Sequence, residues 1–80
     1  MTICQAVEKR IKELLSSHNM SQYRLERKCG LSHETLKNIM RGKTKGVNLR
    51  TLIIIADGFD MSICEFLNTD IFLYDNLVLD

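Results

Sequence analysis

The chain has 80 residues and a mass of 9.3 kDa, a length that supports one small hydrophobic core and excludes most enzyme folds. Apolar residues make up 45% and charged residues 26%, which is typical of a globular domain rather than of a disordered tail. Eleven Lys and Arg against ten Asp and Glu give a net charge of +1, a total that points to no class of partner.

The first expected helix covers about residues 3–16, where apolar residues recur at helical spacing. Thr2 and Gln5 have the spacing of a capping box at its start. The polar run at residues 16–19 has no period and predicts a turn.

Two short helices are expected next, with a tight turn between them. Ser21 and Ser32 are the capping residues of helices at about residues 22–28 and 33–41. Gly30 supplies a left-handed residue that ends the first of the two. The second helix has an apolar inner face, whereas its outer face is wholly polar.

A fourth helix, about residues 49–57, is expected to begin at Asn48 and to end at Gly58. Ser62 and Glu65 have the spacing of a second capping box, which predicts a fifth helix at about residues 63–68. Five residues of the fourth helix are expected to supply much of the core: Leu49, Leu52, Ile53, Ile55 and Ala56.

The last segment, residues 70–80, is acidic and too apolar for a free end. It could pair with a second copy of the chain in a dimer, or it could fold back over its own core, and the sequence leaves both open. The chain is therefore divided into one domain, residues 1–69, and this tail, a possible dimerisation element.

Cys4, Cys29 and Cys64 form no CxxC pair, so the sequence predicts neither a disulfide framework nor a metal site. We expect each of them to be a small buried hydrophobe in a reducing compartment. No histidine or acid is placed by spacing to activate a cysteine, so we expect no catalysis. The sequence predicts no cofactor and no small-molecule ligand.

The N-terminus lacks the pattern of a signal peptide, and the longest apolar run, residues 52–56, is too short to span a bilayer. We therefore expect a cytoplasmic chain with no membrane partner.

Charge is distributed unevenly along the chain. Residues 21–50 contain eight Lys and Arg but only two Glu, whereas residues 51–80 contain six acidic residues and no Lys or Arg. The net charge of +1 thus results from the cancellation of a basic block and an acidic block. A basic block of this kind favours a surface that faces phosphates.

The run SQYRLERKCGLSHETLKNIMRGK resembles the helix-turn-helix of the Cro/CI-type (XRE-type) phage-repressor family. Gln22 matches the start of the first helix, Gly30 the turn glycine, and Leu36 and Ile39 the inward pair of the second, the recognition helix. The similarity continues through NLRTLIIIADGFDMSICEFL and covers about residues 6–68. It implies an all-α, five-helix phage-repressor-like DNA-binding domain with the helix-turn-helix at its second and third helices.

The resemblance also implies which residues contact double-stranded DNA in the major groove. Asn38 could pair with adenine, Lys37 could donate to guanine, and Glu34 could either accept from cytosine or be ordinary surface. The positions implied to contact bases are His33, Glu34, Thr35, Lys37 and Asn38. The positions implied to contact phosphates are Gln22, Arg24, Arg41, Lys43, Thr44, Lys45 and Asn48.

Glu26 departs from the family, which usually has a small residue such as alanine at this position. A buried carboxylate without a partner would be costly, so we expect Glu26 to reach the surface or to pair with a neighbouring base. The candidate partners are Lys28, Arg27 and Lys37.

Two functions fit these observations. One is a sequence-specific transcriptional regulator, most simply a repressor that binds a two-fold operator as a homodimer. The other is an antitoxin-like or scaffold protein of the same fold, which binds another protein through its tail. The basic block favours the first.

Overall fold

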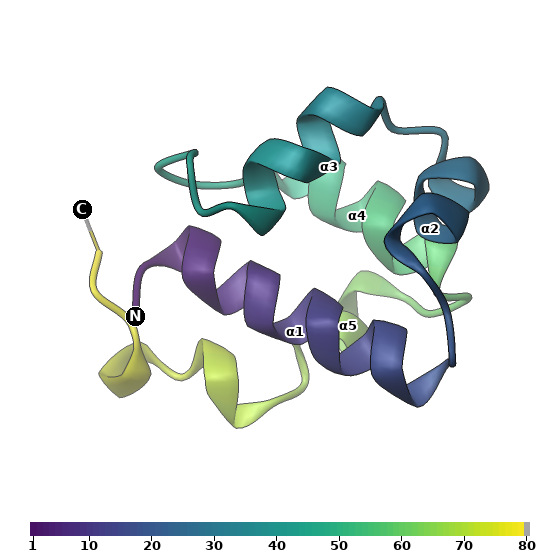
Figure 1. The fold of residues 1–80 in the computed structure, drawn as a ribbon. Helices are drawn as coiled ribbons and strands as arrows, with labels where there is room; N and C mark the ends of the chain where they lie inside the picture. Colours follow the sequence, from purple (N-terminus) through teal and green to yellow (C-terminus); the bar gives the residue numbers. More distant parts are fainter. Residues whose placement is uncertain (80) are drawn as a thin grey trace.

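A computed structural model describes residues 1–79, and Asp80, the last residue of the predicted tail, lies outside the described residues. Five α-helices follow in chain order, and in Figure 1 α1 lies across the middle of the molecule, with α2, α3 and α4 above it and the tail below it. The helices are α1 (Ile3–Ser17), α2 (Gln22–Cys29), α3 (His33–Met40), α4 (Leu49–Gly58) and α5 (Ile63–Leu67). This confirms the predicted all-α, five-helix fold.

Each α-helix begins after a residue whose side-chain oxygen accepts a hydrogen bond from the third backbone N–H of the helix. Both predicted capping boxes are present, at the starts of α1 and α5. The caps are Thr2, Ser21, Ser32, Asn48 and Ser62, all of them as predicted. The starts of the helices are therefore determined locally.

The core is formed by apolar side chains from all five helices and from Phe59, which follows α4. Two residues predicted to lie in it do not: Leu49 is 59% exposed and Ile53 is 47% exposed. They lie four positions apart on one face of α4, while Leu52, Ile55 and Ala56 are on the buried face. Since residues 52–56 are all apolar, hydrophobicity alone did not distinguish the buried face of α4 from the exposed one.

The fourth helix ends at Gly58, as predicted, but this glycine is not in the left-handed conformation. It is the last residue of α4 and is buried, and the left-handed residue that follows the helix is Asp60, with φ of 59°. A Cβ atom on Gly58 would lie 2.9 Å from Leu25 Cδ1 and 3.1 Å from Cys29 Cβ. The glycine thus allows α4 to lie close against α2.

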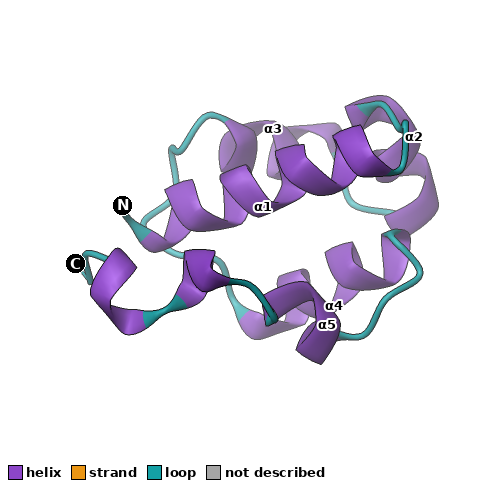
Figure 2. Cartoon of the chain, turned by 90° about the horizontal axis from the view of Figure 1, so that it is seen from below, coloured by secondary structure: helices purple, strands orange, loops and turns teal. Residues whose placement is uncertain are grey.

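The tail folds back on α1 through two 3₁₀ turns, Asp70–Phe72 and Tyr74–Asn76 (Figure 2). Ile71 is buried, and the Val78 N–H donates to the Met1 carbonyl at 2.7 Å. Leu73, which lies between the turns, is 56% exposed. The described part of the tail therefore covers its own core at the first turn but leaves apolar surface beyond it.

Arg10 holds α5 to α1. Its Nε donates to the carbonyl of Phe66 at 2.7 Å and its Nη2 to that of Glu65 at 3.0 Å. Its guanidinium carbon lies 5.8 Å from the centre of the Phe66 ring. These carbonyls belong to the last turn of α5. That of Glu65 also accepts from the Asn68 N–H at 3.2 Å, so Arg10 adds a second donor there as well as a donor to Phe66.

The three cysteines are free and differ in burial. Cys4 is buried and Cys29 is half-buried, but Cys64 is exposed on α5, so the prediction of a buried Cys64 was wrong. Cys64 follows the α5 cap by two residues, on the side of this short helix that faces away from the buried Phe66.

Candidate nucleic-acid interface

The two helices of the predicted motif are joined by a turn that begins at Gly30. This residue has φ of 73°, and its N–H donates to the Glu26 carbonyl at 2.9 Å, which closes the end of α2. Leu25 of α2 and Leu36 of α3 are both fully buried in the common core. The buried leucines fix α3 as a rigid unit whose other face is turned outward.

Three of the five positions implied to contact bases are exposed, and the other two are half-buried. His33, Glu34 and Thr35 are exposed in the first turn of α3, and Lys37 and Asn38 are half-buried one turn later. The Thr35 hydroxyl, however, accepts a hydrogen bond from the cap Ser32 at 2.8 Å. Its hydroxyl is therefore used within the helix start, and its methyl group remains for an apolar contact.

Glu34 and Lys37 form an ion pair on the surface of α3. Their charged atoms are 3.5 Å apart, with side-chain exposures of 69% for Glu34 and 32% for Lys37. An exposed pair of this kind is weak, so either member can exchange its partner for a base edge at small cost.

A hollow lies between α3, the following loop and the start of α4. It is lined by residues implied to contact bases, Thr35 and Asn38, and by residues implied to contact phosphates, Thr44 and Asn48. The Asn48 side chain accepts from the Thr51 N–H at 2.8 Å, so it is occupied as the α4 cap. Backbone N–H groups at this helix start are the remaining donors there.

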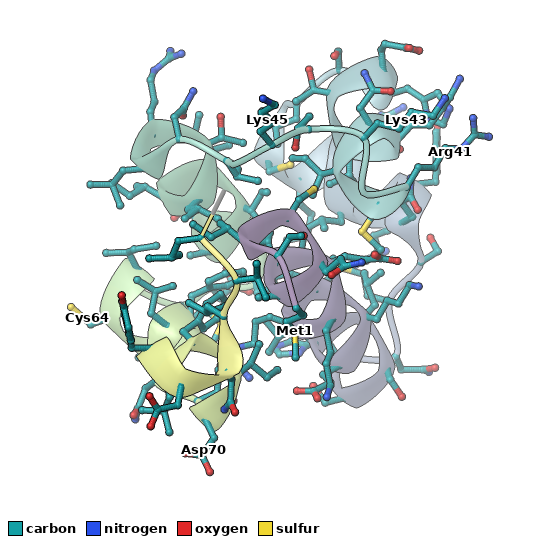
Figure 3. All side chains as sticks on the ribbon, turned by 90° about the vertical axis from the view of Figure 1, so that its left-hand side faces the viewer. Met1, Arg41, Lys43, Lys45, Cys64 and Asp70 are labelled. Carbon is teal, nitrogen blue, oxygen red and sulfur yellow. The ribbon has the colours of Figure 1, made fainter. Side chains whose placement is uncertain are left out.

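The loop after α3 carries three exposed cations, Arg41, Lys43 and Lys45. Figure 3 shows them at one end of the molecule, with Asp70 at the opposite end. The basic loop thus lies away from Asp70 in the acidic tail, although elsewhere the two blocks meet, where Lys28 pairs with Asp60. Separated charge of this kind presents the basic end to a polyanion.

Thr44, in the middle of the same loop, is half-buried, unlike its lysine neighbours. Its hydroxyl oxygen lies 3.1 Å from the sulfur of the buried Cys4, which also donates to the Ile39 carbonyl at 3.5 Å. The role of Cys4 was missed from the sequence, where only its apolar character was apparent. Its thiol anchors the basic loop to α1.

The start of α2 provides the other implied phosphate contacts. Gln22 is half-buried and Arg24 is exposed. Tyr23 and Arg27 form a separate pair, with Arg27 Nη1 donating to the Tyr23 hydroxyl at 3.2 Å. Lys28 pairs with Asp60 at 3.1 Å.

Glu26 neither reaches the surface nor pairs with any of the three bases that were expected as partners. Its side chain is 10% exposed, and its Oε2 lies 2.9 Å from Nδ1 of His33. His33 is the first residue of α3, and the first turn of this helix places its imidazole against Glu26. Lys28 pairs instead with Asp60, and Lys37 pairs with Glu34. No sequence signal singled out His33, because it lies seven positions away and on another helix.

The family model of the Cro/C1-type HTH DNA-binding domain matches residues 10–71, which is more than half of the chain. The chain belongs to this family. Cro/C1-type domains bind DNA, and the five helices of this chain have the corresponding arrangement. No curated protein matches the chain.

Within residues 1–79 of this Cro/C1-type protein, no helix has the length and hydrophobicity needed to cross a membrane. The same residues contain no cluster of three or more His, Cys, Asp or Glu side chains that could hold a metal ion.

Proposed function

We propose that this Cro/C1-type protein is a sequence-specific transcriptional repressor that acts in the cytoplasm by occluding a promoter. The observation that carries the proposal is the arrangement of α3: its polar outer face lies beside the exposed Arg41, Lys43 and Lys45. A helix of this kind fits the major groove, where each base pair has a distinct pattern of donors and acceptors. The adjacent cations supply contacts to the backbone.

In this proposal the base contacts come from the five α3 residues His33, Glu34, Thr35, Lys37 and Asn38. The phosphate contacts come from Gln22, Arg24, Arg41, Lys43, Lys45 and the backbone at Asn48. Thr44 contributes by holding the loop in position, because its hydroxyl contacts Cys4.

The proposal includes a homodimer on a two-fold operator. Leu49 and Ile53 support this part, because they form an exposed apolar face on α4 next to the basic loop. A second copy packed on this face would place two α3 helices on the same DNA molecule.

Selection of bound sites from a random DNA pool, followed by a salt titration, tests the proposal. We expect enriched sites with two-fold symmetry, and an affinity whose logarithm falls with log salt by about 0.9 per neutralised phosphate. No enrichment, together with binding that is insensitive to salt, would contradict a role in operator binding.

The antitoxin-like or scaffold function remains the second candidate, and the apolar surface of the tail favours it. Leu73, Tyr74, Val78 and Leu79 are all more than half exposed. Protein binding through the tail would survive the loss of Lys43 and Lys45, whereas operator binding would not.

A further inference from the structure

Glu26 and His33 form a contact between the two helices of the motif. Glu26 Oε2 lies 2.9 Å from Nδ1 of His33, and its side chain is nearly buried at 10% exposure. The same oxygen accepts a hydrogen bond from Nε2 of Gln22 at 3.5 Å. The imidazole itself is 69% exposed, so its second nitrogen, Nε2, is accessible from outside.

The contact determines which imidazole nitrogen carries hydrogen. A carboxylate only accepts hydrogen bonds, and Glu26 already accepts from the Gln22 amide. The nitrogen that faces it, Nδ1, must therefore be the donor. In a neutral imidazole the other nitrogen is then an acceptor, so Nε2 presents a lone pair to whatever α3 contacts.

We propose that Glu26 is a specificity-determining residue that never touches DNA. By holding hydrogen on Nδ1 of His33, it makes Nε2 an acceptor, and His33 then selects a base that offers a donor in the major groove. Only the amino groups of adenine and cytosine are such donors. This inference rests on the proposed function, in which His33 contacts a base edge.

Removal of the carboxylate leaves the tautomer of His33 undetermined. A glutamine at position 26 can present either its carbonyl or its amino group to Nδ1, so both tautomers of His33 become accessible. The imidazole would then accept from one base and donate to another. The expected effect is a loss of discrimination at one base pair rather than a loss of affinity at every site.

The test is site selection with the wild-type chain, Glu26→Gln, His33→Ala and the double variant, at about pH 8.5, above the range in which imidazoles ordinarily change charge. We expect the wild type to prefer adenine or cytosine at one position of each half-site. Glu26→Gln should reduce that preference by about five- to tenfold. In the His33→Ala background the same substitution should change nothing, because Glu26 acts through the imidazole.

Glu13→Gln is the matched control, since it removes the same charge from an exposed position on α1 and should leave the selected sequence unchanged. Thermal unfolding of each variant checks that the fold is retained. The inference is overturned if Glu26→Gln keeps the wild-type base preference, if it alters every position equally, or if its effect persists without His33. Failure of the wild type to select any sequence would instead overturn the proposed function.

Discussion

The sulfur of Cys4 lies 3.1 Å from the hydroxyl oxygen of Thr44, a contact that joins the first turn of α1 to the basic loop forty residues later. Cys4 is 1% exposed and Thr44 is half-buried, so the contact is partly shielded from water. The start of the loop is also held to α3, where the Lys43 N–H donates to the Asn38 carbonyl at 3.0 Å, but the contact with Cys4 is the one that joins it to α1. The contact therefore couples the order of the basic loop to the packing of α1.

Thr44→Val should lower the free energy of unfolding by about 1 kcal/mol, because it replaces the hydroxyl with a methyl group and leaves the sulfur without this partner. Urea denaturation measures the change. In a Cys4→Ala background the same substitution should cost clearly less, since the two residues share one contact. Additive losses in the double variant would show that the contact contributes nothing.

Gly58→Ala should destabilise the protein by about 1–3 kcal/mol, although alanine is the better helix former. The added methyl group would lie 2.9 Å from Leu25 Cδ1 and would push α2 away from α4. Gly46→Ala is the control, because nothing lies within 4 Å of a Cβ atom there. Equal stability of the two variants in urea would contradict the close-packing role of Gly58.

Arg10→Met should cost about 1–3 kcal/mol, since it removes two hydrogen bonds to the carbonyls at the end of α5. Lys9→Met, at the exposed neighbouring position, removes the same charge and should be close to neutral. Thermal unfolding compares the two. If Lys9→Met were the more costly change, charge rather than the carbonyl contacts would explain the effect.

Asn38→Ala should weaken binding to a selected operator by about tenfold and leave binding to random DNA almost unchanged, because an asparagine amide contacts base edges. Lys43→Ala should weaken both alike and reduce the salt slope by about 0.9. Fluorescence anisotropy at several salt concentrations measures both variants. Equal losses on the two DNAs for Asn38→Ala would mean that this residue does not contact bases.

Ile53→Glu should raise the dissociation constant of a homodimer by about tenfold or more, since it places a charge on the apolar face of α4. Leu73→Glu is the comparison, because it makes the same kind of change on the exposed part of the tail. Sedimentation equilibrium gives both constants. A loss of association in Leu73→Glu alone would move the interface from α4 to the tail.

Local features of the fold could be predicted from the sequence. Caps such as Ser21 and Asn48, and the left-handed Gly30, act within a few residues of their own position, so spacing alone reveals them. The exposure of Ile53 and the burial of Gly58 depend on where α2 lies relative to α4. That information is not contained in a short window of sequence.

In the candidate site, too, some residues could be predicted from the sequence and some contacts could not. The exposed side chains of α3 and of the basic loop follow from helical period and from the resemblance, and their contacts with DNA remain predictions. The partners of Glu26 and Thr44 lie on other elements, so only the three-dimensional structure reveals them. Both contacts hold a predicted residue in place, and neither has a sequence motif.

The separation of the basic loop from the acidic end also affects how the protein approaches DNA. With a net charge of +1 the chain experiences little overall attraction, but the field of the phosphates exerts a torque on a molecule whose two ends carry opposite charge. Within the Debye length, about 8 Å at physiological salt, that torque turns Arg41, Lys43 and Lys45 toward the duplex. Encounters would then begin with α3 already facing the groove, and added salt would slow association by randomising the approach.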